Sequence, residues 1–270
     1  MLEPFGEKRG PVVFVSDAHL GAPAGARERA DWFAAFLRSL IGKIGGLLVV
    51  GDLFDFWFEY RRAIPKGHFQ VCRALADIVG TGVPVLYFGG NHDFWSGSYL
   101  RSEIGMQVTE RPRSLQIQGR SLFVAHGDGL GRGDLGYRVL KRVLRNPLAI
   151  SLYRAIHPDL GIPFAHAFSA VSRKHTLPRE VLVPRLIRDI ARPHLEEGHD
   201  AVVIGHVHEP THLRLAEGEF VILGDWLENF TYLVMENGAL ELRRHRPGIG
   251  DVAIPCGNPA NPGAAIGAGR

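Results

Sequence analysis

The sequence predicts an α/β fold with an inserted helical segment, and three patterns support this class. Short apolar runs rich in Val, Leu and Phe, such as residues 11–16 and 47–50, have the composition of buried strands. The segments that follow them repeat apolar residues at spacings of three and four, as amphipathic helices do. Later apolar runs are joined by short turns such as Asn237-Gly238, which indicates hairpins alongside the parallel strands.

The composition indicates how large a core the chain can bury and in which environment the protein works. With 270 residues, 46% of them hydrophobic, the chain can bury one substantial core, so no second domain of ordinary size is needed. A net charge of +3 suits an anionic substrate or a membrane surface, but without a long basic stripe we expect no nucleic acid partner. The two cysteines form no disulfide framework, which indicates a reducing compartment such as the cytoplasm.

We expect a single domain over residues 1–246, with a helical lid inserted at about 131–178. Residues 247–270 are rich in Gly, Ala and Pro, and they predict a disordered tail. Residues 1–10 lack the apolar block of a secretory signal. No run reaches the roughly 18 uninterrupted apolar residues of a membrane span, so no transmembrane helix is predicted.

The first half of the chain is predicted to alternate strands with helices. Trp32, Phe36 and Leu40 lie on one face of a helix that would cover a sheet. The predicted order is strand 11–16, helix 27–41, strand 47–50, helix 69–79 and strand 83–88.

After Gly105 the pattern changes to hairpins and an insertion. Residues 131–178 mix apolar and basic side chains and predict two or three short helices that form a lid; a plain helical layer with solvated charges is the open alternative. The remaining predictions are hairpin strands at 115–117 and 121–125, a surface helix at 182–195, a strand at 201–204, and hairpin strands at 213–215, 220–223, 232–235 and 240–242.

Five predicted strand ends carry side chains of the kinds that bind metals. Each has an ordinary structural explanation when taken alone: Gly-Asn-His is more often a polar turn, Asp17 can cap a helix, and a single histidine is more often a satisfied core or surface group. Their recurrence at strand ends, where α/β sheets hold their active sites, favours a shared function. The groups are Asp17 and His19, Asp52, Asn91 and His92, His126, and His206 and His208.

The spacing and chemistry of these residues predict a two-metal site. Asp17 and His19 are two residues apart in the sequence. In an extended segment both side chains therefore point to the same side of the backbone and can bind one ion. Asp55, three residues after Asp52, is expected to orient a neighbouring histidine instead of binding metal. Carboxylate, amide and imidazole groups suit Mn, Fe, Zn or Co. Seven ligands exceed what one tetrahedral ion needs, but they suit two ions about 3.5 to 4 Å apart that share a carboxylate and a bridging water.

The same motifs resemble those of the calcineurin-like metallophosphoesterase superfamily, in the family's order, from about Val12 to His208. The resemblance implies a β-sandwich flanked by helices and a hydrolase that uses two divalent ions. The motifs are Asp17-Ala18-His19, Gly51-Asp52-Leu53-Phe54-Asp55, Gly90-Asn91-His92-Asp93, His126-Gly127-Asp128 and Gly205-His206-Val207-His208.

Carried over by position, the resemblance implies a role for each residue. Asp52 would bridge the two ions, and a hydroxide between them would be the nucleophile. His92, paired to Asp55, would steady the transition state or protonate the leaving oxygen. The ligand sets would be Asp17, His19, Asp52 and His208 for one ion, and Asp52, Asn91, His126 and His206 for the other.

Within the superfamily, the segments 16–21, 51–57 and 126–129, with the long insert that follows, are similar to the UDP-2,3-diacylglucosamine hydrolases of lipid A synthesis. This resemblance implies Mn2+-dependent cleavage of a UDP-linked acylated glucosamine to 2,3-diacylglucosamine 1-phosphate and UMP, with peripheral contact with the cytoplasmic face of the inner membrane. The best-known members have Arg after the Asn, where this chain has His92. Branches of the family with His need not share that substrate.

Substrate contacts are a hypothesis based on the charge of the lid, whose side chains can meet a diphosphate or a ribose. Two alternatives stay open. One is a related phosphoesterase for another nucleotide or lipid phosphate, and the other is a scaffold that kept the fold and lost the reaction, which would be expected to lack some ligands. The oligomeric state is also open. The candidate contacts are Asn91, Arg132, Asp134, Tyr137, Arg138, Lys141, Arg145 and Lys174.

Overall fold

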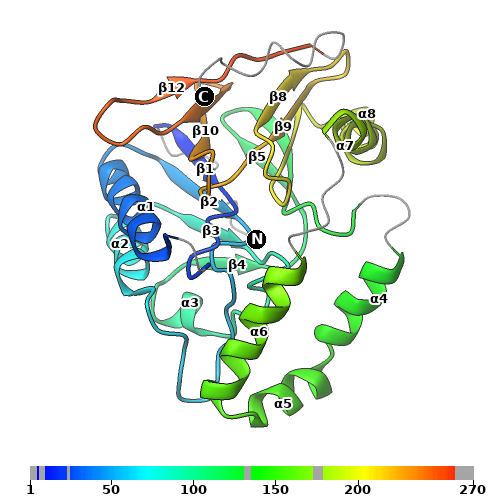
Figure 1. Ribbon diagram of the computed structural model, residues 1–270. Helices are drawn as coiled ribbons and strands as arrows, with labels where there is room; N and C mark the ends of the chain where they lie inside the picture. The colour runs from blue at the N-terminus through cyan, green and yellow to red at the C-terminus, as the bar shows by residue number, and fades with distance from the viewer. Residues whose placement is uncertain (1–4, 6–9, 23–24, 131–134, 173–178, 259–270) are drawn as a thin grey trace.

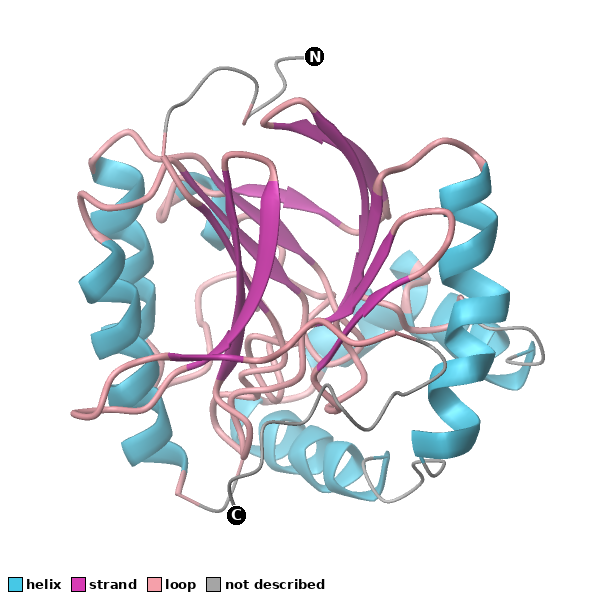
Figure 2. Cartoon of the chain, turned by 90° about the horizontal axis from the view of Figure 1, so that it is seen from above, coloured by secondary structure: helices cyan, strands magenta, loops and turns pink. Residues whose placement is uncertain are grey.

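Two β-sheets face each other in the computed structural model, and helices cover their outer faces (Figure 1). The view along the sandwich in Figure 2 shows these four layers, helix, sheet, sheet and helix. The structure describes residue 5 and residues 10–22, 25–130, 135–172 and 179–258. The predicted class, a β-sandwich flanked by helices, is confirmed.

The first sheet has seven strands in the order β12-β11-β10-β1-β2-β3-β4. Strands β1 to β4 run parallel, and β10 to β12 are antiparallel. Strands β1, β2 and β3 are buried along their whole length, which explains their continuous apolar sequences. The strands are β1 (Val12–Val15), β2 (Gly46–Val50), β3 (Val85–Phe88), β4 (Gln107–Thr109), β10 (Thr231–Glu236), β11 (Ala239–Arg244) and β12 (Val252–Ala253).

The second sheet has five strands in the order β5-β6-β7-β9-β8. The predicted hairpin of β5 (Arg113–Ile117) and β6 (Arg120–Ala125) is present. Strand β6 then runs parallel to β7 (Ala201–Ile204), and β7 runs parallel to β9 (Glu219–Ile222). Strand β8 (Thr211–Arg214) closes the edge. The parallel strands of both sheets thus end on the same side of the sandwich.

Three apolar layers hold the sandwich together. The inner layer joins the facing sides of the sheets, with Phe14 and Leu48 from the first and Val203 and Val221 from the second. Helices α1 (Ala26–Leu40) and α2 (Phe69–Gly80) cover the outer face of the first sheet. The outer face of the second sheet is covered by α7 (Arg179–Leu186), the π-helical turn η1 (Ile187–Ala191) and α8 (Arg192–Glu196).

The inserted segment forms three helices beside the sandwich, α4 (Leu135–Leu144), α5 (Pro147–Ala155) and α6 (Pro158–Ser172) (Figure 1). A largely aromatic cluster joins α5 and α6 to the sandwich: Phe56, Phe58 and Tyr60 are buried there, and Trp95 and Tyr153 pack against these three residues. No described helix combines the length and the apolar composition that crossing a bilayer requires.

Some local expectations differ from the structure. The predicted disordered tail is ordered as far as residue 258, because β12 pairs with β11 and Gly257 pairs with Leu213; the rest of it lies outside the described residues. The predicted helix over 182–195 is interrupted by η1, next to Pro193, which has no N–H to donate to the preceding turn. The short strand β4 and helix α3 (Tyr99–Ser102) were not predicted.

Candidate metal centre

All seven predicted ligands lie where the parallel strands end, at the junction between the two sheets. Asp17, Asp52 and Asn91 follow β1, β2 and β3 of the first sheet. His126 follows β6 of the second sheet, and His206 and His208 follow β7. Each sheet therefore contributes part of the candidate site, and these side chains come together only when the sheets pack face to face.

One group consists of Asp17, His19 and His208. The Nε2 atoms of the two imidazoles are 3.2 Å apart, and Asp17 Oδ1 lies 3.7 Å from His19 Nε2 and 3.5 Å from His208 Nε2. Ligand atoms that share one ion are spaced by about 3 to 3.5 Å, because each is about 2 to 2.3 Å from the metal. Asp17 Oδ1 is buried and has no hydrogen-bond partner among the described residues, so its free lone pairs fit a cation.

The second group consists of Asp52, His126 and His206. His126 Nε2 lies 3.3 Å from Asp52 Oδ2 and 3.1 Å from the amide oxygen of Asn91. The other ring nitrogen, Nδ1, is 2.9 Å from the carbonyl oxygen of Val50, which fixes its orientation and leaves Nε2 as the inward atom. These donors fit a second divalent ion of the same borderline type.

Asp52 Oδ2 stands between the two groups. It is 3.3 Å from His126 Nε2 on one side and 3.7 Å from His19 Nε2 on the other. Its partner oxygen Oδ1 accepts the backbone N–H of His92 at 2.9 Å, which holds the carboxylate in this orientation. A carboxylate so placed can be shared by two ions.

The backbone at the site is not extended, which corrects one sequence-based expectation. Asp17, His19, Asp52 and His206 all have positive φ, between 41° and 64°. Left-handed backbone is strained for residues other than glycine. Backbone contacts impose it here: Asp17 N–H donates to Gly51 at 3.1 Å and His19 N–H donates to Asp52 at 3.0 Å. The side chains converge through these turns and not through strand alternation.

Three glycines leave the space that the side chains of Asp17, Asp52 and His126 occupy. A Cβ on Gly90 would lie 2.1 Å from Asp52 Oδ1, and one on Gly205 would lie 2.8 Å from Asp17 Oδ2. Gly51, which has φ of +85°, would place a Cβ 2.3 Å from His126 Nδ1. The glycines before Asp52, Asn91 and His206 therefore make room for the carboxylates and the imidazole.

Asp93 supports the site without belonging to either group, and sequence reasoning gave it no role. It is fully buried, and its carboxylate accepts the backbone N–H groups of Gly90 at 2.9 Å, Asp52 at 3.3 Å and Phe54 at 3.1 Å. Burial, with the Asp52 carboxylate nearby, raises the pKa of Asp93 to about 6. Its presence directly after Asn91-His92 in the motif was the available signal.

His92 contacts Asp55 mainly through the backbone carbonyl group of Asp55. His92 Nδ1 is 3.0 Å from the Asp55 carbonyl oxygen and 3.9 Å from its carboxylate. Asp55 Oδ1 lies closer to His19, 3.5 Å from Nδ1. The carboxylate thus sits between two imidazoles, whereas the carbonyl orients His92 so that Nε2 faces the centre, 4.0 Å from Asp52 Oδ2.

The electrostatic environment of the site favours the charged forms of its carboxylates and of His19. Burial alone would lower the pKa of His19, but the carboxylates of Asp17 and Asp55 outweigh it and raise that pKa to about 10. Burial would likewise raise the pKa of Asp52, but His126 and His92 hold it well below its usual range. The carboxylates therefore stay ionised and the site attracts cations.

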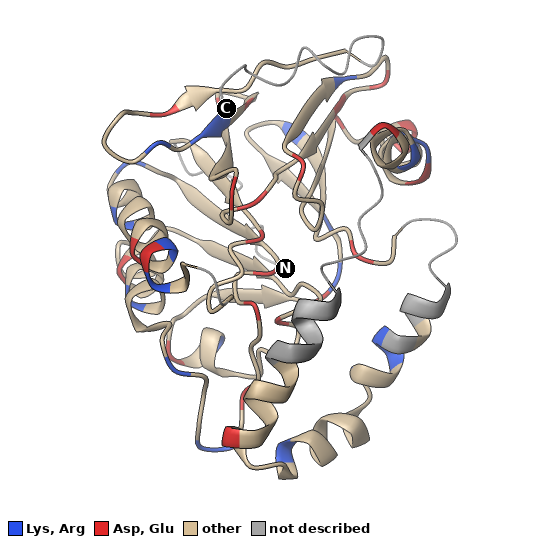
Figure 3. Ribbon diagram, in the orientation of Figure 1, with Lys and Arg blue, Asp and Glu red and all other residues tan. Residues whose placement is uncertain are grey.

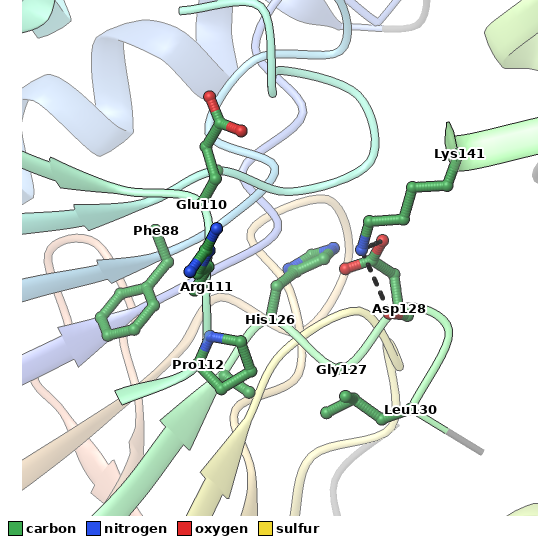
Figure 4. A pocket seen from close by; sticks show the side chains of 11 residues that line it. Phe88, Glu110, Arg111, Pro112, His126, Gly127, Asp128, Leu130 and Lys141 are labelled. Atoms are coloured by element: carbon green, nitrogen blue, oxygen red, sulfur yellow. Dashed lines mark hydrogen bonds and ion pairs between the residues drawn. The ribbon is translucent and has the colours of Figure 1, made fainter. Parts of the chain in front are cut away.

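The predicted substrate contacts are described only in part. Arg132, Asp134 and Lys174 lie outside the described residues, as do the side chains of Tyr137 and Arg138 on α4. Asn91 lies in the metal centre. Lys141 is ion-paired with Asp128, beside a small pocket that His126 also lines (Figure 4). The guanidinium of Arg145 lies 5.0 Å above the Phe94 ring.

The chain matches known proteins over most of its length. A family model described as calcineurin-like phosphoesterase covers residues 10–210. The chain is 32% identical to a UDP-2,3-diacylglucosamine hydrolase of Porphyromonas gingivalis, in a match over 87% of this chain and 97% of that protein. It is 30% identical to a hydrolase of the same name from Pseudomonas fluorescens, over 84% of this chain and 93% of that one.

Among solved structures, an archaeal phosphodiesterase matches with a TM-score of 0.46 at 12% identity, over 90% of this chain and 99% of that one. The family match spans every strand-end motif of the site, from Asp17 to His208. The chain is therefore a hydrolase that belongs to the calcineurin-like phosphoesterase family.

Proposed function

We propose that the protein hydrolyses UDP-2,3-diacylglucosamine to 2,3-diacylglucosamine 1-phosphate and UMP, with two divalent ions at the junction of the sheets. The observation that carries the metal part of this proposal is the position of Asp52 Oδ2, between His126 Nε2 and His19 Nε2. Two ions held there would supply a nucleophilic water at neutral pH and offset the charge of the phosphoryl group.

The protein's own residues would orient the reaction. Asp17, His19 and His208 would hold one ion, Asn91, His126 and His206 the other, and Asp52 both. The Asp55 carbonyl fixes His92 with Nε2 toward the centre, where a protonated imidazole can give its proton to the leaving phosphate oxygen. We propose Mn2+ as the metal, because oxygen and imidazole donors suit it.

The choice of substrate rests on the relatives and on the lid. The two relatives named above are UDP-2,3-diacylglucosamine hydrolases and match this chain nearly end to end. Apolar side chains in the lid are also unusually exposed, with Leu148 at 75%, Leu152 at 73% and Phe164 at 68%. Large apolar side chains exposed in this way are typical of a binding surface, and acyl chains are a suitable partner for them.

We propose that this lid surface also contacts an anionic membrane, from which a substrate with two acyl chains would be taken. The exposed Arg154 lies on α5 with Leu148 and Leu152, and the exposed Arg142 lies on α4 with the exposed Val139 and Val143. In the described parts of these helices, Figure 3 shows mostly uncharged positions, with basic ones on α4 and α5 and the acidic Asp159 on α6. A basic and apolar helical surface of this kind binds at the headgroup boundary. Cosedimentation with vesicles containing phosphatidylglycerol, but not with purely zwitterionic vesicles, is the expected result, and Leu148→Glu with Leu152→Glu should abolish it.

The substrate proposal is tested by comparing kcat/KM for UDP-2,3-diacylglucosamine, UDP-N-acetylglucosamine and bis(p-nitrophenyl) phosphate under Mn2+. We expect a strong preference for the acylated substrate. Equal turnover of the two UDP compounds would instead favour a general nucleotide pyrophosphatase. Absence of turnover with all three, in protein that contains metal, would favour a scaffold that kept the fold.

A further inference from the structure

The last turn of α4 is bonded at both ends to loops of the metal centre. At one end, Lys141 forms an ion pair with the buried carboxylate of Asp128, two residues after His126. At the other end, the indole N–H of Trp95 donates to the carbonyl oxygen of Leu144 at 3.0 Å. Leu144 is the last residue of α4, where carbonyl groups have no partner within the helix, so the indole satisfies one of them.

The two loops belong to different sheets. Asp128 follows β6 of the second sheet, and Trp95 follows β3 of the first. Arg145, one residue beyond α4, adds a second contact to the first sheet, because its Nη1 lies 3.8 Å from Glu110 Oε2 just after β4. Figure 4 shows Lys141 reaching from α4 to Asp128, on the side of the pocket away from Glu110. Residues 141–145 thus connect the sheets at the place where their loops form the metal centre; we call them the strap.

The attachment on the Trp95 side is firm. Residues 57–59 run beside 92–95, with Trp57 N–H donating to the His92 carbonyl and Glu59 N–H to the Trp95 carbonyl, both at 3.3 Å. The Trp95 ring also packs against Phe58, at 5.1 Å between ring centroids, and against Tyr153, at 5.2 Å. A displacement of Trp95 would therefore move the segment that carries His92.

We propose that the strap sets the spacing between the two loops, and hence the fit of Asn91 to His126. These two side chains come from different sheets, and their ligand atoms are 3.1 Å apart. On this view Lys141 and Trp95 are positioning residues, and Lys141 acts through Asp128 and not as a contact to substrate. The metal part of this inference rests on the proposed two-metal function; the mechanical part does not.

The mechanical part is tested by amide hydrogen exchange in metal-free protein. Lys141→Met keeps the aliphatic length of the side chain and removes its charge. We expect amides of residues 90–95, on the opposite sheet from Asp128, to exchange about fivefold faster along with those of 126–130, since an ion pair of this exposure contributes about 1 kcal/mol. Trp95→Phe, which removes the indole N–H together with part of the ring that packs on Phe58 and Tyr153, should have the same effect on both loops. If Lys141→Met speeds exchange only in residues 126–130, the proposal that the strap sets the spacing between the two loops is overturned.

Titration of the metal-free protein with Mn2+ tests the consequence for the site, with no substrate present. Lys141→Met should weaken one of the two binding events about tenfold, the lower range for partners outside the ligand shell. Asp128→Asn should weaken the same binding event, and the loss in the double variant should be smaller than the sum of the two single losses, because both changes break one ion pair. Lys43→Met, at an exposed lysine after α1, is the matched control.

The outcomes separate the two proposals. If wild-type protein binds fewer than two ions, the proposed two-metal function fails, and the exchange experiment still decides the strap. If wild-type protein binds two ions and Lys141→Met binds both equally well, the strap does not control the site. An increase in KM for the UDP-lipid alone, with exchange and metal affinity unchanged, would make Lys141 a substrate contact and overturn its positioning role.

Discussion

Asp93 ties the end of β3 to the end of β2, because its Oδ1 accepts the backbone N–H of Asp52 at 3.3 Å across 41 residues of sequence. Asp93→Asn keeps the shape but can turn an N–H2 group toward these backbone donors. We expect metal affinity to fall about tenfold to a hundredfold, as for other partners of ligands, with the fold retained. Calorimetric titration with Mn2+ measures this loss. Asp77→Asn, at an exposed position on α2, should leave affinity unchanged.

Asp52→Ala should abolish binding of both ions and turnover together, because Asp52 Oδ2 faces both ligand groups. Asp17→Ala, in contrast, should remove one ion and leave the other, since Asp17 belongs to only one group. Metal content after dialysis, measured by elemental analysis, distinguishes the two variants. Two ions retained by Asp52→Ala would refute the bridging role.

His92→Asn should retain both metals and lose about a hundredfold in kcat, the lower range for removal of a general acid. The loss should grow for aryl phosphodiesters whose leaving phenol is less acidic, because those leaving groups need the proton most. Burial lowers the pKa of His92, so wild-type kcat should fall as pH rises above that lowered pKa. A variant whose loss is the same for every leaving group would point to a role in transition-state charge stabilisation alone.

Gly90→Ala should disable the centre through steric contact alone, since the new Cβ would lie 2.1 Å from Asp52 Oδ1. The carboxylate must then rotate away from one of the two ligand groups. We expect loss of at least one ion and at least about a hundredfold loss in turnover. Gly80→Ala, at the end of α2 with open space around it, is the matched control and should be neutral.

Glu219→Gln tests an ion pair remote from the metal centre. His212, 2.8 Å away, and Arg120, 2.9 Å away, lower the pKa of Glu219 to about 2 against the opposing effect of burial. A depressed folded-state pKa stabilises the protein above the unfolded value of 4.5, and this contribution is lost as pH falls toward 2.

The free energy of unfolding of the wild type should therefore drop between pH 5 and pH 3, by an amount on the order of 2 kcal/mol for this group. Glu219→Gln should show a shallower drop over the same range. Urea denaturation of metal-free protein at several pH values measures both slopes. Parallel slopes would mean that other carboxylates dominate the acid response.

The candidate ligands were visible in the sequence because their chemistry is local: Asp17 and His126 each stand directly after an apolar run typical of a buried strand. The buried parallel strands were visible for the same reason. The left-handed backbone at Asp17 and His19 was not, because it depends on hydrogen bonds to Gly51 and Asp52 on the neighbouring loop. Such partners are fixed only when the strands pair.

Two other features depend on contacts between distant segments. Strand β12 contributes only two residues and pairs with β11, so nothing in its own composition marks it. The contact of Lys141 with an anionic substrate stays a prediction, whereas its ion pair with Asp128, which the docking of α4 brings to it, was not predicted. Charge alone predicts that a residue needs a counter-ion and does not say which one.

The positive φ angles at Asp17, His19, Asp52 and His206 bear on how the protein can be engineered. Each costs on the order of 1 kcal/mol that glycine would avoid. A screen for thermal tolerance carried out with chelator present would therefore favour glycine at these positions and enrich inactive variants. Screens with saturating metal would reverse that bias, because only the native side chains gain binding energy from the ions.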